Sequence, residues 1–273
     1  MRIALVQFNI DHKNKQTNWA RAEAYMAQAA QQDVDLIVFP EFFLGGPGRK
    51  STLVNPTHQL CILAKRYGMD LVPGTVIEQD DDGRYYNNAY YIDASGKILL
   101  KYTKVHLWQH ERKYLEPGAF TFGTVKNRFG IVVGLCACWD IANPAVFREM
   151  ALNGNANLVI VPAYWTMTEV DGGYDSASEH NLVSHLCASR AFENGICVAF
   201  CDAAEGASSP YGRLTGASRV AVPFKGVVTQ APDDTEHLLI TSLDIPLETS
   251  TAESLFQFKA DWHAGRVFPG SKL

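Results

Sequence analysis

Two cysteines separated by one residue are the most reactive side chains that the sequence brings close together. They lie in Leu135-Cys136-Ala-Cys138-Trp-Asp140, at the end of an apolar segment. A cysteine where a strand meets a loop can present its sulfur to a pocket, and a nearby base raises its reactive thiolate fraction. Zinc sites need a second Cys/His pair, which is absent, and thioredoxin-type chemistry uses Cys-x-x-Cys. This leaves a nucleophilic cysteine, or two small buried apolar residues, as the open hypotheses.

Two charged residues also follow segments with the pattern of strands. Glu41 comes directly after Asp35-Leu-Ile-Val-Phe-Pro40, a continuous apolar run typical of a strand buried on both faces. Lys104 ends the segment 98–104. Ligands in α/β folds bind beyond the carboxyl ends of strands, so both side chains are candidates for a site. Taken singly, each also has an ordinary structural explanation, as a loop-capping glutamate or a surface lysine.

The elements that must position these residues alternate between helices and strands. We predict strands at 2–8, 35–40, 71–77, 85–93, 98–104, 131–138, 157–162, 196–203, 217–223 and 237–244. We predict helices at 15–32, 57–67, 145–153 and 176–192, followed by a polar tail. The segment Asn157-Leu-Val-Ile-Val-Pro162 repeats the earlier order of helix, turn, buried strand and proline, which indicates two similar α/β halves. The expected architecture is two packed sheets with helices outside, an α-β-β-α sandwich.

The composition is typical of a globular protein and disfavours several functions. Of 273 residues, 47% are hydrophobic and 19% are charged, and the formal net charge is -5. The absence of a basic stripe argues against a nucleic-acid partner, and no apolar stretch is long enough to span a membrane. The N-terminus lacks the pattern of a signal peptide, and the dispersed cysteines favour a reducing, cytoplasmic compartment. Ser271-Lys272-Leu273 is a peroxisomal address in a eukaryote or else a chance tripeptide.

Taken together and in order, the three reactive stretches resemble the catalytic motifs of the nitrilase superfamily of carbon–nitrogen hydrolases. The resemblance runs from Arg2 to about Leu243. The motifs are Phe39-Pro-Glu41-Phe-Phe, Lys101-Tyr-Thr-Lys104-Val-His106-Leu-Trp108, the Cys138-Trp139-Asp140 stretch, Ala188-Ser-Arg-Ala-Phe-Glu-Asn194 and Gly216-Ala-Ser218-Arg-Val-Ala-Val-Pro223. Three catalytic motifs in register with two flanking motifs make the match specific.

The resemblance assigns a role to each candidate residue. It implies that Cys138 is the nucleophile, that Glu41 is the general base and that Lys104 stabilises the oxyanion. Glu111, in a Glu-x-x-Tyr-x-x-Pro-Gly stretch, matches a second glutamate that orients the amide nitrogen or holds the lysine. We expect Glu41 and Lys104 to be in contact, because a neighbouring ammonium group lowers the free-energy cost of a buried carboxylate.

Other nearby residues have less direct roles in this interpretation. Cys136 lies one strand period before Cys138, so both point to one side if the strand stays regular, and we expect Cys136 to be buried. His106 is expected to be structural, because glutamate is the base in the family. Arg148 and Arg190 are candidates for gripping a substrate carboxylate only in principle.

The same resemblance indicates the substrate class. Nitrile-hydrolysing members typically carry Cys-Trp-Glu, whereas amide and carbamoyl hydrolases more often carry Cys-Tyr-Asp or Cys-Trp-Asp, the form found here. We therefore expect hydrolysis of a small amide to acid and ammonia through a cysteine thioester. Substrate-binding walls are expected from Phe42, Trp139, Tyr164 and Trp165. A nitrilase, an N-carbamoyl amide hydrolase using the same site and a catalytically silent scaffold are the alternatives.

The expected organisation is one carbon–nitrogen hydrolase domain over residues 1–273, with about 246–273 as a C-terminal arm. The resemblance implies a homodimer or a higher homo-oligomer, with the arm reaching across the interface. We expect no cofactor, no metal and no partner other than the amide and further copies of the chain.

Overall fold

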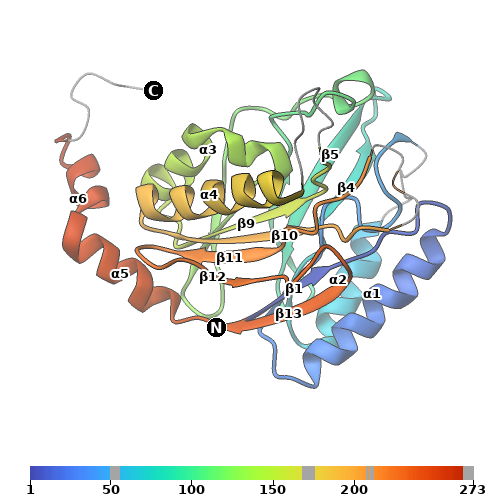
Figure 1. Cartoon of the computed structure of the whole chain (residues 1–273), viewed down its shortest axis with the longest axis horizontal. Coiled ribbons are helices and arrows are strands. Elements are labelled where there is room, and N and C mark those ends of the chain that lie inside the picture. The colour runs from blue at the N-terminus through green and yellow to red at the C-terminus, as the bar shows by residue number, and fades with distance from the viewer. Residues whose placement is uncertain (50–55, 168–175, 207–208, 210–211, 267–273) are drawn as a thin grey trace.

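The computed structural model describes residues 1–49, 56–167, 176–206, 209 and 212–266, and two stacked sheets form its centre (Figure 1). Within these residues one sheet has seven strands and the other has six. The first runs in the order β13 (His237–Ser242), β1 (Arg2–Gln7), β2 (Leu36–Val38), β3 (Asp70–Val72), β5 (Tyr85–Ile92) and β4 (Thr75–Gln79), and β6 (Ile98–Thr103) also pairs with β5. The second runs in the order β12 (Gly226–Gln230), β11 (Arg219–Val222), β10 (Cys197–Asp202), β9 (Leu158–Ala163), β8 (Val132–Leu135) and β7 (Thr124–Lys126).

Each sheet contains three neighbouring parallel strands, with antiparallel strands at their sides. The parallel strands are β1, β2 and β3 in the first sheet and β8, β9 and β10 in the second. This confirms the prediction of two similar α/β halves. The late strand β13 completes the first sheet by pairing antiparallel with β1, so that Arg2 lies opposite Ser242.

Helices cover the outer face of each sheet and produce the predicted α-β-β-α sandwich (Figure 1). The helices α1 (Lys15–Ala30) and α2 (Pro56–Tyr67) pack on the first sheet, and α3 (Pro144–Arg148) and α4 (Ser176–Asn194) lie on the second. The side chains of β2 show why both faces of the first sheet are covered. Ile37 packs with the side chains of α1 and α2, whereas Leu36 and Val38 pack in the core between the sheets. Alternating residues are therefore buried on opposite faces, as the continuous apolar run predicted.

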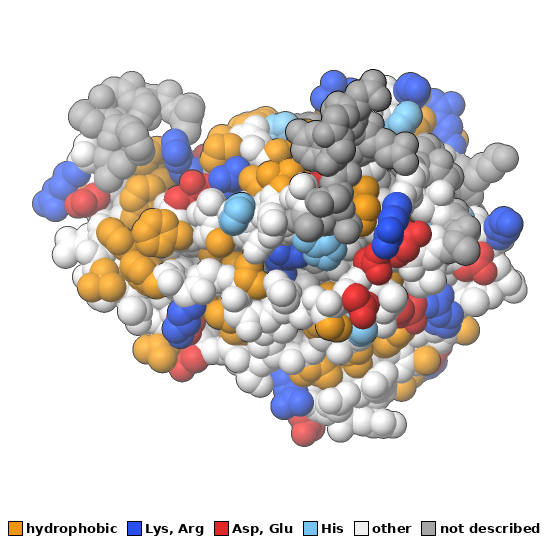
Figure 2. All heavy atoms as spheres, viewed as in Figure 1, with side chains coloured by type: hydrophobic (Ala, Val, Ile, Leu, Met, Phe, Trp, Pro, Cys, Tyr) orange, Lys and Arg blue, Asp and Glu red, His pale blue; other side chains and the backbone are white. Residues whose placement is uncertain are grey.

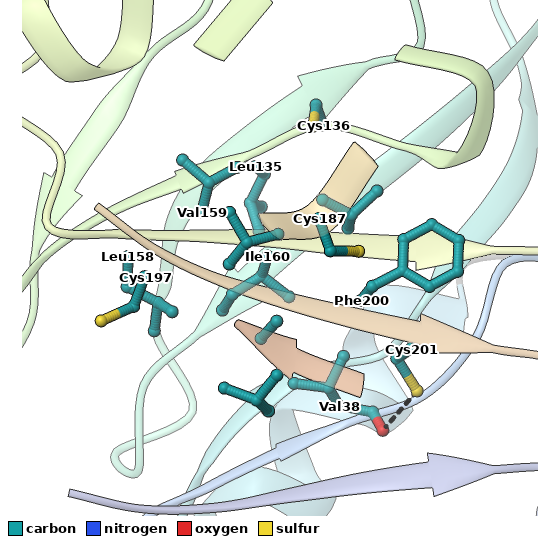
Figure 3. Close-up of a cluster of buried hydrophobic side chains, with 14 of the residues drawn as sticks. Val38, Leu135, Cys136, Leu158, Val159, Ile160, Cys187, Cys197, Phe200 and Cys201 are labelled. Carbon is teal, nitrogen blue, oxygen red and sulfur yellow. Dashed lines mark hydrogen bonds between the residues drawn. The ribbon is translucent and has the colours of Figure 1, made fainter. Parts of the chain in front are cut away.

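Free cysteines are buried in the apolar core of the protein (Figure 3). The Cys201 thiol of β10 lies 3.3 Å from the carbonyl oxygens of Val6 and Val38, and so connects the two sheets. Cys136, which follows β8, and Cys187, on the outer helix α4, are also fully buried. Their surroundings fit the role of small apolar residues, and we infer no disulfide framework.

The predicted strand 71–77 is two strands, because the chain turns at Gly74. Its φ is 57°, and a Cβ atom at this position would lie 1.8 Å from the carbonyl oxygen of Pro40. Glycine is therefore needed both for the backbone angle and for the close approach. Since Pro40 precedes Glu41, this turn packs directly against the loop that carries the expected base.

The predicted polar tail is helical over most of its length. The helices α5 (Ile245–Phe256) and α6 (Phe258–His263) follow β13, and Ile245, Thr249 and Ala252 are buried on α5. The Asp244 side chain caps α5 by accepting a hydrogen bond from the Leu247 amide, and a proline follows in the first turn, which together form a helix start signal. The predicted helix 145–153 is α3 followed by a π-helical turn, and the strands β7 and β12 were not predicted.

In the part of the chain that the structure describes, no helix is long and apolar enough to cross a membrane. The tripeptide Ser271-Lys272-Leu273 lies outside the described residues.

Candidate active site

The four expected catalytic residues line one cavity of about 370 Å³. Glu41 follows β2, Lys104 follows β6, and Cys138 lies three residues beyond the end of β8. Glu111 begins a short 3-10 helix, Glu111–Lys113. Both sheets therefore contribute to the site at the carboxyl ends of their strands, where the fold class places ligands.

The Glu41 carboxylate is held on both of its oxygens. Oε1 accepts hydrogen bonds from Asn87 Nδ2 and Lys104 Nζ, each at 2.8 Å, and Oε2 accepts one from the Tyr164 backbone amide at 3.1 Å. The side chain is only 1% exposed. The expected contact between Glu41 and Lys104 is thus present. Asn87 was not predicted, although two adjacent asparagines in an otherwise aromatic strand were a usable signal.

Lys104 forms a buried ion pair with each of two glutamates. Its Nζ lies 2.8 Å from Glu41 Oε1 and 2.8 Å from Glu111 Oε1, and its side chain is fully buried. The Trp108 backbone amide donates to Glu111 Oε2 at 2.7 Å, which fixes the second carboxylate. An ammonium group has three N–H donors, so two ion pairs leave a third direction available for a substrate oxygen.

Burial determines the protonation of this cluster. It raises the pKa of Glu41 to about 7, an effect that Lys104 opposes and Glu111 reinforces. Burial alone would lower the pKa of Lys104, but Glu111 and Glu41 outweigh it and hold the pKa well above its usual value. Burial, together with the Glu41 charge, raises the pKa of the Cys138 thiol well above its usual value. The resting cysteine is therefore a thiol, and it needs a base in order to react.

Cys138 lies in a strained turn rather than in a strand. The strand β8 ends at Leu135, and Cys138 has a φ of 46° at the start of the 3-10 helix Cys138–Ala142. Its Sγ faces the Tyr164 carbonyl oxygen at 3.9 Å. The regular strand needed to point Cys136 and Cys138 to the same side is absent, so that conditional prediction does not apply. Cys136 is fully buried in the core, as expected (Figure 3).

Asp140 braces this turn against the segment that carries Lys104. One of its oxygens accepts hydrogen bonds from the Ala137 amide at 2.8 Å and from the Tyr102 hydroxyl at 2.6 Å. The other lies 2.8 Å from His106 Nδ1 and accepts from the His106 amide at 3.1 Å. His106 thus makes the structural contacts that the sequence predicted.

The cavity walls are aromatic. Phe42, Trp139, Tyr164 and Trp165, all expected there, line the cavity with Trp108. The Trp139 ring centroid lies 4.4 Å from that of Trp108 and 5.8 Å from that of Trp165. This wall can bury an apolar or flat part of a small substrate.

Two arginines considered for substrate binding do not line the cavity, and an unpredicted glutamate does. The guanidinium group of Arg190 donates to the backbone carbonyl oxygens of Ile141 and Ala142, so it supports the Cys138 turn from behind. Arg148 also lies outside the cavity lining. Glu179 of α4 lines the cavity and was missed, because one acidic residue on a helix has no distinctive pattern.

Comparisons with known proteins find relatives of this chain among carbon–nitrogen hydrolases. The carbon-nitrogen hydrolase family model matches residues 2–253. The chain is 31% identical over 252 residues to an (R)-stereoselective amidase from Pseudomonas sp, covering 89% of this chain and 86% of the relative. It is 28% identical over 270 residues to an omega-amidase from Saccharomyces cerevisiae, covering 89% of this chain and 87% of the relative. It is 26% identical over 272 residues to a 2-oxoglutaramate amidase from Bacillus subtilis, covering 93% and 94% respectively.

Solved structures show the same fold. Nit3 from Saccharomyces cerevisiae, described as a member of branch 10 of the nitrilase superfamily, superposes with a TM-score of 0.82 at 26% identity, covering 94% of each chain. An amidase from Nesterenkonia sp. superposes with a TM-score of 0.76 at 26% identity, covering 89% of this chain and 90% of the other.

Proposed function

Because the chain belongs to the carbon-nitrogen hydrolase family, in the amidase-like branch of the nitrilase superfamily, we propose that it hydrolyses a small amide through a thioester on Cys138. The products are the carboxylic acid and ammonia. The observation that carries the proposal is the convergence of Cys138, Glu41, Lys104 and Glu111 on one buried cavity. Amidase names among the relatives support the choice of an amide.

In the first half-reaction, Glu41 takes the thiol proton and the sulfur of Cys138 forms a bond to the amide carbon. The carbonyl π electrons move to the oxygen, where the Lys104 ammonium group and the Trp139 amide stabilise the charge. The C–N bond then breaks, the nitrogen takes the proton back from Glu41, and ammonia leaves.

In the second half-reaction, Glu41 removes a proton from water and the hydroxyl group attacks the thioester carbon. The C–S bond breaks, the thiolate recovers the proton, and the acid leaves. The sum is amide plus water to acid plus ammonia, with the site returned to its starting protonation. Glu111 orients Lys104 throughout, since its Oε1 lies 2.8 Å from Nζ.

The buried charges make the proton transfer from Cys138 to Glu41 feasible. The transfer replaces a carboxylate by a thiolate beside the same ammonium group, so the number of buried charges does not change. Burial raises the pKa of both acids, and therefore disfavours the anion before and after the transfer. The raised pKa of Glu41 also makes it a stronger base than an exposed carboxylate.

The direct test is ammonia release from matched small amides, N-carbamoyl compounds and nitriles. We expect release from an amide, loss of that release in Cys138→Ala and its retention in Cys136→Ala. Mass spectrometry of the wild type quenched during turnover should find the acyl group on Cys138. Release mainly from nitriles or N-carbamoyl compounds would replace the amidase assignment, and no release from any of them would favour the catalytically silent scaffold.

We also infer that the chain pairs with a second copy through an exposed aromatic patch. The patch consists of Phe192 on α4, Phe256 on α5 and Phe224 between β11 and β12, each about half exposed. The Phe224 and Phe256 rings are stacked at 5.3 Å. Hydrophobic side chains gather over α5 at the left of Figure 2. Exposed apolar patches of this kind mark protein interfaces, and the family resemblance supports pairing through helices.

A further inference from the structure

The backbone of Tyr164 contacts both the proposed base and the proposed nucleophile. Its amide donates a hydrogen bond to Glu41 Oε2 at 3.1 Å, and its carbonyl oxygen lies 3.9 Å from Cys138 Sγ. Tyr164 directly follows β9, which ends at Ala163. A shift of Tyr164 would therefore change the position of Glu41 relative to Cys138. The reaction proposed above requires a proton to pass between these two side chains, so their separation affects the rate.

The side chain of Tyr164 connects this backbone to a segment near the N-terminus. Its hydroxyl group lies 3.0 Å from His12 Nε2 and 2.9 Å from Ser209 Oγ. The rings of His12 and Tyr164 also meet edge to face, with centroids 5.9 Å apart. His12 lies between β1 and α1, and it is not among the residues that line the cavity. It can therefore influence the site through Tyr164 without touching a substrate.

His12 is itself held in place from two sides. The buried Asn18 side chain of α1 bonds both backbone groups of the preceding residue, accepting from the Asp11 amide at 2.9 Å and donating to the Asp11 carbonyl oxygen at 2.8 Å. On the other side, a Cβ atom at Gly46 would lie only 2.1 Å from His12 Cδ2. The imidazole ring thus packs directly against the loop that follows Glu41.

The neutral form of the imidazole suits this contact. Burial lowers the pKa of His12, although the charge of the Asp11 carboxylate opposes the effect. A neutral imidazole has one N–H donor and one acceptor nitrogen, so Nε2 can pair with the Tyr164 hydroxyl group in either direction. A glutamine side chain offers a donor and an acceptor at a similar reach, whereas alanine offers neither.

We propose, on the basis of the function proposed above, that His12 is a positioning residue for the reaction. It acts through the Tyr164 hydroxyl group and so fixes the backbone that holds Glu41 and faces Cys138. Because His12 touches no substrate, its removal lowers the rate of the chemical step and leaves substrate binding unchanged. The segment between β1 and α1 is therefore part of the support of the site.

The first test is a double-variant cycle with an amide that the wild type hydrolyses. We expect His12→Ala to lower kcat about 10-fold with KM unchanged, because a contact that positions the reacting groups is lost. His12→Gln should restore most of this loss. In Tyr164→Phe the hydroxyl group is absent, so adding His12→Ala should lower kcat no further. The control is His58→Ala, at an exposed position on α2, which should leave kcat and KM unchanged.

The second test measures alkylation of Cys138 by iodoacetamide and needs no amide hydrolysis. The thiol proton passes to Glu41, the sulfur forms a bond to the methylene carbon, and iodide leaves. We expect His12→Ala to lower the alkylation rate of Cys138 about 10-fold and His12→Gln to restore it. Peptide mass spectrometry measures this rate, and the partly exposed Cys61 on α2 is the internal control, whose rate should not change.

The two tests separate this proposal from the proposed function. An alkylation rate that depends on His12 as expected would support the positioning role even if no amide is hydrolysed. Equal alkylation of Cys138 in the wild type and His12→Ala would overturn it even if amides are substrates. A further decrease of kcat on adding His12→Ala to Tyr164→Phe would also overturn it, because His12 would then act through packing against Gly46 rather than through the hydroxyl group.

Discussion

The Cys138 sulfur owes its position to a backbone angle that most residues avoid. With φ at 46°, Cys138 leaves the line of β8 and starts a 3-10 helix that Asp140 holds from inside. Such strain persists only where surrounding contacts enforce it, and it is concentrated at functional sites. The adjacent contacts of Asp140 to Tyr102 and His106 supply that enforcement.

The acid limb of the pH profile should report on Glu41. In the proposed mechanism Glu41 must be ionised to accept the thiol proton. Burial raises its pKa to about 7, so kcat/KM should rise with pH through about 7. Asn87 donates to the ionised form, so Asn87→Leu removes a contact that lowers the pKa. We expect the midpoint of the acid limb in Asn87→Leu to lie about one pH unit higher than in the wild type.

Asn88→Leu is the matched control for this shift. Asn88 is the next residue of β5 and donates to Glu78 rather than to Glu41. Its replacement should leave the acid limb where it is. An unmoved limb in Asn87→Leu would show that Asn87 only supports the strand.

Removing the Lys104 charge should destabilise the fold as well as slow the reaction. Lys104→Met leaves two buried carboxylates without their counter-charge, and breaking a buried pair in this way costs about 3–5 kcal/mol. The folded-state pKa of Glu41, already raised above its unfolded value, rises further, so the folded state holds its proton to higher pH. The loss of folding stability caused by Lys104→Met should therefore be larger at pH 8 than at pH 5.

Denaturant unfolding of Lys104→Met and the wild type at both pH values measures this difference. A destabilisation independent of pH would contradict the role of the ammonium group as counter-charge. The proposed role of Lys104 as an oxyanion donor predicts that Lys104→Met also lowers the rate by a factor on the order of 10²–10³.

At the scale of elements, the turn between β3 and β4 sets the position of the loop that carries Glu41. The Gly74 backbone lies against the carbonyl group of Pro40, which leaves no room for a side chain. The Phe42 amide donates to Thr75 Oγ1 at 3.2 Å, so the first residue of β4 also holds this loop.

Gly74→Ala should therefore reduce both stability and kcat. The new Cβ atom would clash with the Pro40 oxygen, and alanine would be strained in the left-handed backbone conformation. Together these effects should lower the free energy of unfolding by roughly 1–3 kcal/mol or more. The control is Gly68→Ala, at a φ of 64° with nothing within 4 Å of the new atom. Gly68→Ala should lose only the free energy of backbone strain, about 1 kcal/mol of stability, and its kcat should be unchanged. Equal kcat values in the two variants would argue against a positioning role for the turn.

At the scale of the whole molecule, the aromatic patch and the cavity lie at different places on the protein surface. The patch lies on α4, α5 and the turn after β11, whereas the cavity opens at the carboxyl ends of the strands. Dimerisation through the patch would bury aromatic surface that is now in water, and a stable interface covers about 800 Å² on each partner.

Phe256→Glu should therefore shift a dimer toward monomers. The residue is 54% exposed, and a charge at the centre of an apolar interface opposes association. Light scattering after size-exclusion chromatography measures the mass. Ile62→Glu, at a 45% exposed position on α2 in the opposite layer, should leave the mass unchanged. A wild-type monomer, or an equal mass for wild type and Phe256→Glu, would exclude this interface.

Much of this molecule could be read from local patterns. The strands buried on both faces, β2 and β9, were predicted because their apolar runs end in proline, and a helix precedes each of them. The order of the glutamate, lysine and cysteine motifs pointed to the family and to a small amide. These features depend on residue type and on spacing along the chain, which the sequence states directly.

Only the tertiary structure decided which side chains meet. Glu41, Asn87, Lys104 and the Tyr164 amide come from four separate segments, and they touch because two sheets place the ends of their strands at one cavity. The sequence likewise could not place Glu179 in that cavity, since a helix rotation depends on packing with the sheet beneath it. Contacts between distant segments, and the pKa values that burial imposes on them, are set by the packed fold rather than by neighbours in the chain.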